Sequence, residues 1–412
     1  MSPARRGDEM RRTTRVRIAL VITAVAAGLL AATAAARTHS AAAGKPIVIG
    51  AVVDLTKNMA PFDAPALLAA QLEIKAINAK GGVDGRPLKM VFLNDQLDPA
   101  KTKQDAVSML AKKVDIGWVT CDVNYAAPAA QEFLNAGKLT IAPCIGTDEL
   151  SPLRFGAKGK LGFSFGNAGQ DEGAAAAEYA FKVKHWKTAD VVTDNLLRYF
   201  QDVCKAFTVR FTQLGGKIVA QEAFTQGDKT INNVVSKVNN EKADGIAFCT
   251  SFGADQPAFV AGLRSLHNET PIINGWASDG NYWWPKSPPV TNFYYLTYAS
   301  VWGDDPSPQV RALEAQMKAA GHPAQTGGFV TGAAAIQGIA TAITDAHGST
   351  NGATLANVMV KFHKVPTISG NVSFSAGLHA VFGRAYRVIL VNDNKAKLVG
   401  EVTASSPANI GR

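Results

Sequence analysis

The amino-acid sequence predicts an α/β protein made of two lobes of similar plan, each built on a parallel sheet. Strand-like apolar runs alternate with helix-like segments, and that order implies right-handed crossovers and parallel pairing. The order of elements also recurs: Gly81-Gly82 and Gly215-Gly216 each follow a predicted helix and lie 134 residues apart. At 412 residues the chain is long enough for two or three domains.

The first lobe is expected to begin with a buried-strand run, IVIGAVVDL, at 47–55. A helix with one apolar face follows, and it ends at Gly81-Gly82, where positive φ is available. The residues that repeat at helical spacing on this face are Leu67, Ala70, Ile74 and Ile77. The next expected elements are a strand at 88–95, a helix around 107–110, and strands at 114–121 and 138–144.

The second lobe is expected to repeat this plan. Its predicted elements are a strand at 188–195, a helix that ends at Gly215-Gly216, and strands at 217–224, 245–252 and 270–277. Two further strand-like runs occur at 293–300 and 387–393, with a helix containing Leu355 and Val358 between them. Because these runs follow two complete lobes, we expect the chain to cross between the lobes more than once.

Residues 1–43 have the order of a secretory signal. Six arginines precede an uncharged apolar run from Ile18 to Ala36, and alanine-rich A-x-A cleavage patterns lie at its end. We therefore expect export to the periplasm or the cell exterior, with the signal peptide cleaved. An uncleaved N-terminal anchor is the alternative, because the run approaches the length of a membrane span.

The charge argues against nucleic-acid binding. Residues 1–36 hold six arginines against Asp8 and Glu9, so the rest of the chain carries +5 of the overall +9. Beyond the signal, Lys and Arg are scattered without a run of five or more.

Four cysteines permit three disulfide pairings. Cys121 and Cys144 each end one of two neighbouring strand-like runs, and adjacent strands lie about 4.8 Å apart, within the Cα separation that a disulfide needs. An exported protein can keep such a bond, so we predict Cys121–Cys144 and, by elimination, Cys204–Cys249. No C-x-x-C pattern supports a metal site, and no cofactor is expected.

The order of several stretches resembles a known family. These stretches are IVIGAVVDL, INAKGGVDGRPLKMVFLNDQLDPAK, AGKLTIAPCIGTDEL, LGGKIVAQEAFTQGDKT, GIAFCTSFGAD, LRSLHNETPIINGWASDGNYWW and FVTGAAAIQGIATAI. Together they look like the type I periplasmic solute-binding proteins of ABC importers, in particular those for branched-chain amino acids, over nearly all of residues 46–400.

The resemblance implies two Rossmann-like lobes joined by three crossover strands, which close around a small solute. It assigns residues 44–164 and 297–373 to lobe 1, residues 165–296 and 374–403 to lobe 2, and residues 404–412 to a tail.

The resemblance also implies where the solute binds. In amino-acid binders, hydroxyl and amide groups on two lobe-1 loops hold the solute carboxylate. The matching positions are Asp122, Val123, Asn124 and Tyr125 on one loop and Cys144, Ile145 and Gly146 on the other. Val123 and Gly146 stand where a serine and a threonine are expected, although a slip of one residue brings Asp122 or Thr147 there instead. In these binders an acid holds the ammonium group of the solute, and the matching position in this chain is Trp276. A lobe-2 tyrosine of the binders is matched by Tyr199.

Because these polar anchors are changed, we expect a solute other than a plain α-amino acid. A zwitterion sealed in a cleft without paired charges loses several kcal/mol. An aromatic-walled cleft suits a flat or apolar solute, or a cation over a ring face. The candidate walls are Phe62, Tyr125, Tyr199, Phe252 and Trp276, and the candidate polar partners are Asp122, Asn124 and Asp279. The alternative is that these rings only fill the lobe cores; Tyr282, Trp283 and Trp284 are expected at the surface or the cleft rim.

The expected function is capture of a small molecule by hinge closure and its delivery to a membrane permease, by a monomer. The main alternative is a sensing module that presents its closed form to a signalling receptor. An enzyme is not expected, since the chain has no G-x-x-x-x-G-K-[ST], G-x-G-x-x-G, G-x-S-x-G or H-E-x-x-H pattern.

Overall fold

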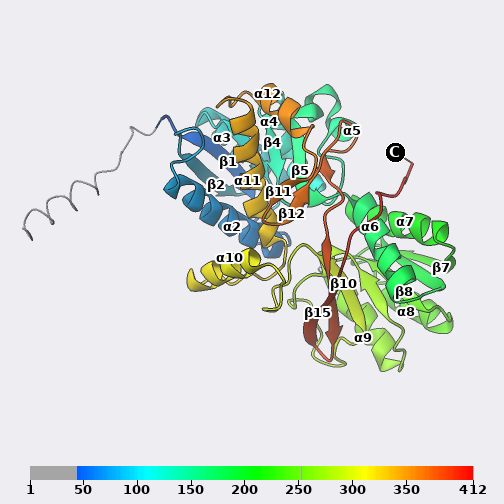
Figure 1. Cartoon of the computed structure of the whole chain (residues 1–412). Coiled ribbons are helices and arrows are strands. Elements are labelled where there is room, and N and C mark those ends of the chain that lie inside the picture. The colour runs from blue at the N-terminus through cyan, green and yellow to red at the C-terminus, as the bar shows by residue number, and fades with distance from the viewer. Residues whose placement is uncertain (1–43, 252, 412) are drawn as a thin grey trace, which may run out of the picture. The chain divides into compact units, whose positions relative to one another are not determined.

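Two sheets organise the chain, and helices cover both faces of each (Figure 1). The computed structural model describes residues 44–251 and 253–411, so the predicted signal and anchor at 1–43 lie outside the described residues. Both sheets belong to the unit Pro46–Arg412. We call the part built on the first sheet lobe 1 and the part built on the second sheet lobe 2.

The first sheet has six strands in the order β13-β5-β4-β3-β1-β2, all paired in parallel. These strands are β1 (Ile47–Val53), β2 (Leu88–Asn94), β3 (Ile116–Val119), β4 (Thr140–Ala142), β5 (Gly162–Asn167) and β13 (Ala380–Val381). Successive residues of a strand point to opposite faces, so Ile49 and Ala51 pack on one side and Val52 on the other.

Five main helices cover these two faces. One face packs against α2 (Ala60–Ala79), α11 (Phe329–Asp345) and α12 (Gly352–Met359). The other packs against α3 (Pro99–Ala111) and α4 (Val123–Asn135), while the short α5 (Pro152–Phe155) and η1 (Gly156–Leu161) lead from β4 to β5. Strands buried on both faces read as continuous apolar runs, which is why IVIGAVV carries no polar alternation.

The second sheet has seven strands in the order β15-β14-β10-β9-β8-β6-β7. They are β6 (Thr188–Asp194), β7 (Lys217–Phe224), β8 (Gly245–Cys249), β9 (Ile272–Asn274), β10 (Phe293–Thr297), β14 (Tyr386–Asn392) and β15 (Lys395–Val402). One face packs against α6 (Gly169–Glu178) and α7 (Arg198–Gln213), and the other against α8 (Ile231–Asn240) and α9 (Asp255–Ser265).

The chain passes between the sheets three times, which confirms the expected two-lobe fold. The first connection joins β5 to α6, and the second runs from β10 past α10 (Pro308–Ala319) to α11. The third joins β13 to β14. The remaining short elements are η2 (Tyr179–Val183), η3 (Trp276–Ser278), β11 (Val365–Thr367) and β12 (Gly370–Val372).

Two details differ from the expected plan. β13 lies within residues 374–403, which the resemblance assigns to lobe 2, yet it pairs with β5 of the first sheet. A strand of two residues has no periodicity by which a sequence could reveal it. The second sheet is also not wholly parallel, because β14 runs antiparallel to both β10 and β15. Asp393 and Asn394, both at positive φ, form the tight turn between β14 and β15.

Both predicted disulfides are confirmed. Cys121 and Cys144 follow the paired strands β3 and β4, and their Cα atoms are 4.8 Å apart. Cys204 of α7 bonds to Cys249 at the end of β8, with a Cα separation of 5.8 Å. Each bridge therefore joins elements that pack together anyway.

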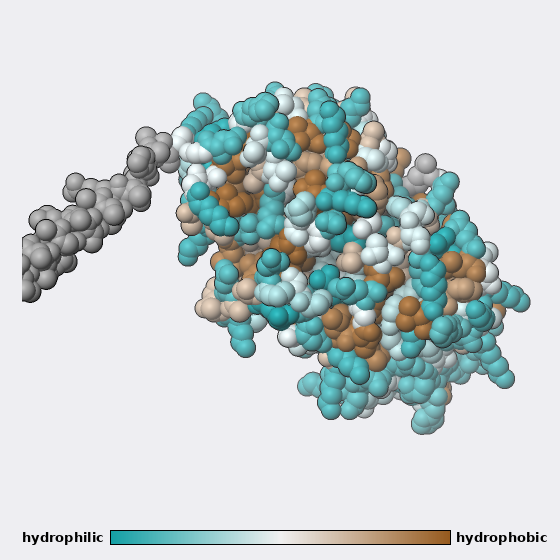
Figure 2. Space-filling model, in the orientation of Figure 1, coloured by the Kyte–Doolittle hydropathy of each residue, from teal (hydrophilic) through white to brown (hydrophobic). Residues whose placement is uncertain are grey.

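The surface of the described region is mostly hydrophilic on the face that Figure 2 shows, with apolar residues in separate patches. Large exposed apolar side chains are Phe92, Val107, Leu153, Val183, Leu196, Leu266, Tyr282 and Val399. Across residues 44–251 and 253–411, no helix is both long enough and apolar enough to cross a bilayer.

Candidate functional site

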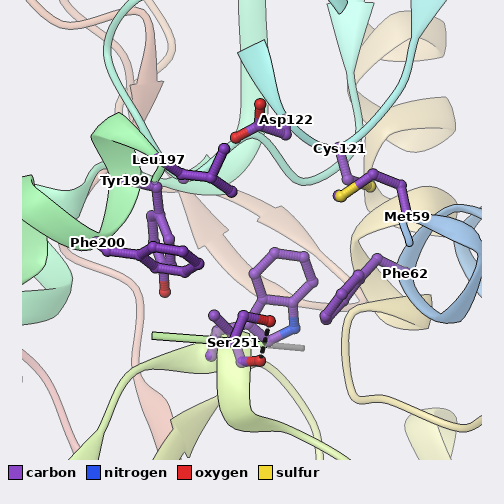
Figure 3. Close-up of a pocket in the computed structure, with 11 residues that line it drawn as sticks. Met59, Phe62, Cys121, Asp122, Leu197, Tyr199, Phe200 and Ser251 are labelled. Atoms are coloured by element: carbon purple, nitrogen blue, oxygen red, sulfur yellow. Dashed lines mark hydrogen bonds between the residues drawn. The ribbon is translucent and has the colours of Figure 1, made fainter. Parts of the chain in front are cut away.

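A small pocket, with a cavity volume of about 20 Å³, lies between the loops that follow the carboxyl ends of strands from both sheets. Ligands of open α/β folds bind at this edge. Lobe 1 contributes Met59, Phe62, Cys121, Asp122 and Gly146 to its lining, and lobe 2 contributes Leu197, Tyr199, Phe200, Ser251, Trp276 and Ala277 (Figure 3).

Two buried acids hold the lobe-1 loops in place. The Asp54 carboxylate accepts hydrogen bonds from the amides of Lys57 (2.9 Å) and Met59 (3.0 Å), which shapes the loop after β1. Asp63, at the start of α2, accepts from the Asp54 amide (2.9 Å), the Cys121 amide (2.9 Å) and the Thr120 hydroxyl. Asp63 therefore ties the loop after β1 to the loop after β3. Burial raises the pKa of Asp63 to about 8, despite these three donors.

Asp122 is the one carboxylic acid among the lining side chains, which include no Lys, Arg or His. It caps the N-terminus of α4, where its Oδ1 accepts from the amides of Asn124 (2.8 Å) and Tyr125 (3.4 Å). Desolvation by burial raises the pKa of Asp122 to about 6, although the Arg154 guanidinium opposes that shift. The disulfide at Cys121 anchors this loop to the loop after β4.

The ring of Tyr199 explains the glycine at position 146. A Cβ on Gly146 would lie 2.4 Å from Cδ2 of Tyr199, closer than side-chain atoms approach. Tyr199 belongs to lobe 2 and Gly146 to lobe 1, so this contact brings the two lobes together. The change from the expected hydroxyl residue to glycine thus makes room for an aromatic ring.

Glu172 of α6 orients two lobe-2 residues of the pocket lining. Its Oε1 accepts from the hydroxyl of Tyr199 (2.5 Å) and the amide of Trp276 (2.5 Å), so one carboxyl group orients two lining residues. A Cβ on Gly275 would lie 2.0 Å from the same oxygen, so glycine is needed there. Glu172 is fully buried, which raises its pKa to about 7.

Trp276 connects the pocket with the segments that join the lobes. Its ring meets Phe62 of lobe 1 edge to face at 4.9 Å and stacks on Tyr298 at 5.3 Å. Tyr298 accepts a hydrogen bond from the Asn167 amide (3.2 Å), and the Arg384 guanidinium lies 4.5 Å from its ring centre. Tyr298 and Arg384 lie in the second and third connections, and Asn167 ends β5 directly before the first. The three connections therefore meet next to Trp276, through Tyr298.

Five of the predicted site residues line the pocket, namely Phe62, Asp122, Gly146, Tyr199 and Trp276. Phe252 lies outside the described residues. Cys144 contributes through its partner, because Cys121 of the same disulfide faces the pocket. Whether these side chains bind a solute stays a prediction.

Five other predicted residues do not line the pocket. Val123 and Ile145 face the helix-covered core of lobe 1. Asn124 accepts a hydrogen bond from Arg154 at 2.8 Å, and Tyr125 packs against the core around Cys121. Asp279 accepts from the Thr297 hydroxyl and the Gly327 amide, so it holds the second connection. These side chains are held by other parts of the fold: Val123 and Ile145 by apolar packing, and Asn124 and Asp279 by hydrogen bonds.

Five further residues line the pocket and were not predicted from the sequence: Met59, Leu197, Phe200, Ser251 and Ala277. Ser251 and Ala277 follow strands β8 and β9, so the carboxyl-edge rule could have found them. Leu197 and Phe200 flank Tyr199 in the stretch LRYF. Thr147, the alternative anchor, is buried but does not line the pocket. Trp283 packs in the lobe-2 core, whereas Tyr282 is 39% exposed.

The side chains of Asp63, Cys121 and Cys144 come close enough to suggest a metal site. Both sulfur atoms are joined in the disulfide, however, so neither is a thiolate that could bind a metal. This cluster therefore provides no metal centre.

The sequence model of a family described as periplasmic binding protein matches residues 46–396. A Leu/Ile/Val-binding protein of Rhizobium johnstonii is 24% identical over 336 residues, which are 80% of this chain and 87% of that protein.

Solved structures of similar fold include proteins crystallised with different solutes. One is the branched-chain amino acid transporter substrate binding protein LivJ of Streptococcus pneumoniae in complex with isoleucine (TM-score 0.70, 20% identity, 86% of this chain and 99% of that one). Another is an ABC transporter solute binding protein of Rhodopseudomonas palustris in complex with 3,4-dihydroxybenzoic acid (TM-score 0.71, 17% identity, 88% and 98%).

Proposed function

Since the chain belongs to the periplasmic binding protein family, as the sequence resemblance predicted, we propose that it is the solute-binding component of an ABC importer. It captures a small molecule outside the cytoplasm and delivers it to a membrane permease. The observation that carries this proposal is the pocket at the carboxyl edges of both sheets, to which each lobe contributes side chains.

The lining residues favour a solute with a flat, apolar body and not a plain α-amino acid. Four of its eleven residues are aromatic, and Asp122 is the one charged group. An α-amino acid needs a partner for each of its two charges, because an unpaired buried charge is costly. The structural relatives crystallised with isoleucine and with 3,4-dihydroxybenzoic acid share one fold, so the choice of solute lies in the lining residues and not in the fold.

Several contacts between the lobes support closure around the solute. Besides the Phe62–Trp276 pair, the Gln170 side-chain amide donates to Asp148 at 2.6 Å, and Arg198 lies 3.8 Å from Glu149. Opening the lobes breaks these contacts, and a solute that touches both lobes restores the closed form. The three connections between the lobes serve as the hinge and meet next to Trp276. Trp276 also lines the pocket, so it links the pocket to the hinge.

A thermal-shift screen tests the proposal. The full chain, purified free of solute, is screened with amino acids, aromatic acids, amides and polyamines. A solute at 100 times its Kd adds about 2.7 kcal/mol to the free energy of unfolding, so a genuine ligand raises Tm clearly. If no metabolite in such a screen raises Tm, the solute-binding role is wrong; if leucine or its relatives alone do, the inference from the changed anchors is wrong.

Trp276→Ala tests whether this pocket is the binding site. We expect at least about 30-fold weaker binding of the best solute by calorimetry, since a central aromatic side chain dominates such interfaces. The control is Phe92→Ala, which removes a ring that is 44% exposed on β2, away from the pocket lining. Equal affinity of Trp276→Ala and wild type would place the site elsewhere.

A further inference from the structure

The charge of the pocket carries a further inference, which rests on the proposed solute-binding role and narrows the class of solute. Asp122 is the one charged side chain in the lining, and no Lys, Arg or His is among the eleven lining residues. Its Oδ1 accepts both backbone hydrogen bonds of the helix cap, whereas its Oδ2 accepts none from the described residues. One carboxylate oxygen therefore remains for a solute.

Two arginines of the surrounding segments, Arg154 and Arg198, are engaged with other groups. Arg154 donates to Asn124 Oδ1 at 2.8 Å and to Glu149 at 3.0 Å, and Arg198 pairs with Asp202 at 3.2 Å. No ion pair within 4.0 Å involves Asp122 in the described part of the chain. The Arg154 guanidinium acts on it only as a more distant charge, and Glu149 acts in the opposite sense.

Burial makes the charged form of this carboxyl group costly. A buried charge without a partner is destabilised, and here desolvation raises the pKa of Asp122 to about 6. The same desolvation strengthens the attraction between Asp122 and any cation that enters, because the local dielectric is low. A solute anion such as a carboxylate would meet repulsion there instead.

The aromatic rings complete a site for an organic cation. Phe62 and Trp276 meet at 64°, and Tyr199 and Phe200 meet at 62°, so ring faces and edges point in several directions around the space. Figure 3 shows Tyr199 and Phe200 on one side of that space and Phe62 on the other, with Asp122 above them and Ser251 below. Ring faces attract cations, and rings also cover an apolar body.

We propose that the solute is an organic ammonium compound, whose positively charged nitrogen pairs with Asp122 Oδ2 and whose apolar or aromatic body lies among the rings of Phe62, Tyr199, Phe200 and Trp276. Asp122 provides the polar anchor in lobe 1, and the lobe-2 rings close over the body. This arrangement replaces the two-charge recognition of an amino acid with one charge and a set of ring contacts.

The test compares matched compounds that differ in charge. Phenethylamine, its neutral N-acetyl derivative and the anion 3-phenylpropionate are titrated into the solute-free full chain by calorimetry at pH 7.5, alongside smaller and larger primary and quaternary amines. We expect the amines to bind at least about 30-fold more tightly than matched neutral and anionic compounds, as for a desolvated charge pair. Lowering the pH below about 6 should weaken amine binding about tenfold per unit, because protonation removes the Asp122 charge.

Asp122→Asn removes the charge and keeps the helix cap, since asparagine caps helices as well as aspartate. Amine binding should weaken at least about 30-fold and binding of the neutral compound should stay unchanged. The control is Asp98→Asn, which makes the same change at the cap of α3, away from the pocket lining.

Three outcomes would overturn the ammonium inference: neutral or anionic compounds bind as tightly as the amines, Asp122→Asn binds amines like wild type, or no amine binds. In each of these cases the wider metabolite screen decides separately whether the chain binds a solute at all. A carboxylate compound that raises Tm in that screen, for example, would refute the inference of a cationic solute and leave the proposed importer role intact.

Discussion

The two halves of the pocket are built in different ways. Lobe 1 offers the charged group, and its loops are held by buried acids and a disulfide, as Asp63, Asp122 and the Cys121–Cys144 bridge show. Lobe 2 offers most of the aromatic surface, and a single buried carboxyl group, that of Glu172, orients Tyr199 and Trp276. The difference indicates that lobe 1 fixes the position of a polar group on the solute, while lobe 2 supplies apolar area on closing.

The largest effect is expected where the halves touch. Gly146→Val would place side-chain atoms in the ring of Tyr199, because even a Cβ at this position lies 2.4 Å from it. We expect about 100-fold weaker solute binding by calorimetry, because overpacking a filled contact costs about 1–3 kcal/mol. Small-angle scattering should show a more open particle in the presence of solute.

Gly377→Val is the matched control for this change. No atom lies within 4 Å of a Cβ at Gly377, so this variant should bind solute and close like wild type. If the Gly146→Val variant also closes and binds solute normally, the two halves of the pocket do not meet through Gly146 and Tyr199.

The two disulfides test whether the halves are anchored differently. Replacing Cys121 and Cys144 by alanine opens a 23-residue loop, and replacing Cys204 and Cys249 opens one of 45 residues. On the chain-entropy model, these double variants lose about 3 and about 4 kcal/mol of stability in denaturant unfolding. Only the first bridge joins two loops of the pocket, so only its loss should also weaken binding, by about tenfold. Equal effects of both double variants on affinity would contradict this difference.

The smallest effect concerns the pH dependence of stability. Burial raises the pKa of Glu172 from 4.5 to about 7, so between these values the folded protein holds a proton that the unfolded chain has lost. Stability therefore falls as the pH rises from 4.5 to about 7 and is flat above, as far as this group is concerned. Glu172→Gln should remove this part of the slope in chemical denaturation measured at several pH values.

Asp244→Asn provides the control for that experiment. The amides of Lys187 and Thr188 donate to Asp244 and lower its pKa below 3.8, so its effect falls at lower pH and has the opposite sign. Asp63 and Asp279, whose pKa values are also raised by burial, should keep some of the slope in the Glu172 variant. An unchanged slope after Glu172→Gln would show that Glu172 is not the acid that burial protonates.

The sequence by itself determined the lobes, the order of most strands and both cysteine pairs. These properties depend on short-range regularities: apolar runs of strand length, helical repeats such as Leu67–Ala70–Ile74, and cysteines at the ends of adjacent parallel strands. The resemblance to the binding-protein family located the loops around Asp122, Gly146, Tyr199 and Trp276, and the rule that parallel strands end at one edge explains why these loops meet.

Only the tertiary structure decided which loop side chains face the pocket. Asp63 binds the Cys121 amide across 58 residues, and Glu172 binds the Trp276 amide across 104 residues. Asp279 is turned away because the Gly327 amide, 48 residues further on, binds it. Loop residues have no periodicity, and their direction is set by hydrogen bonds between segments that only the folded chain brings together, so their sequence neighbours contain no trace of these contacts.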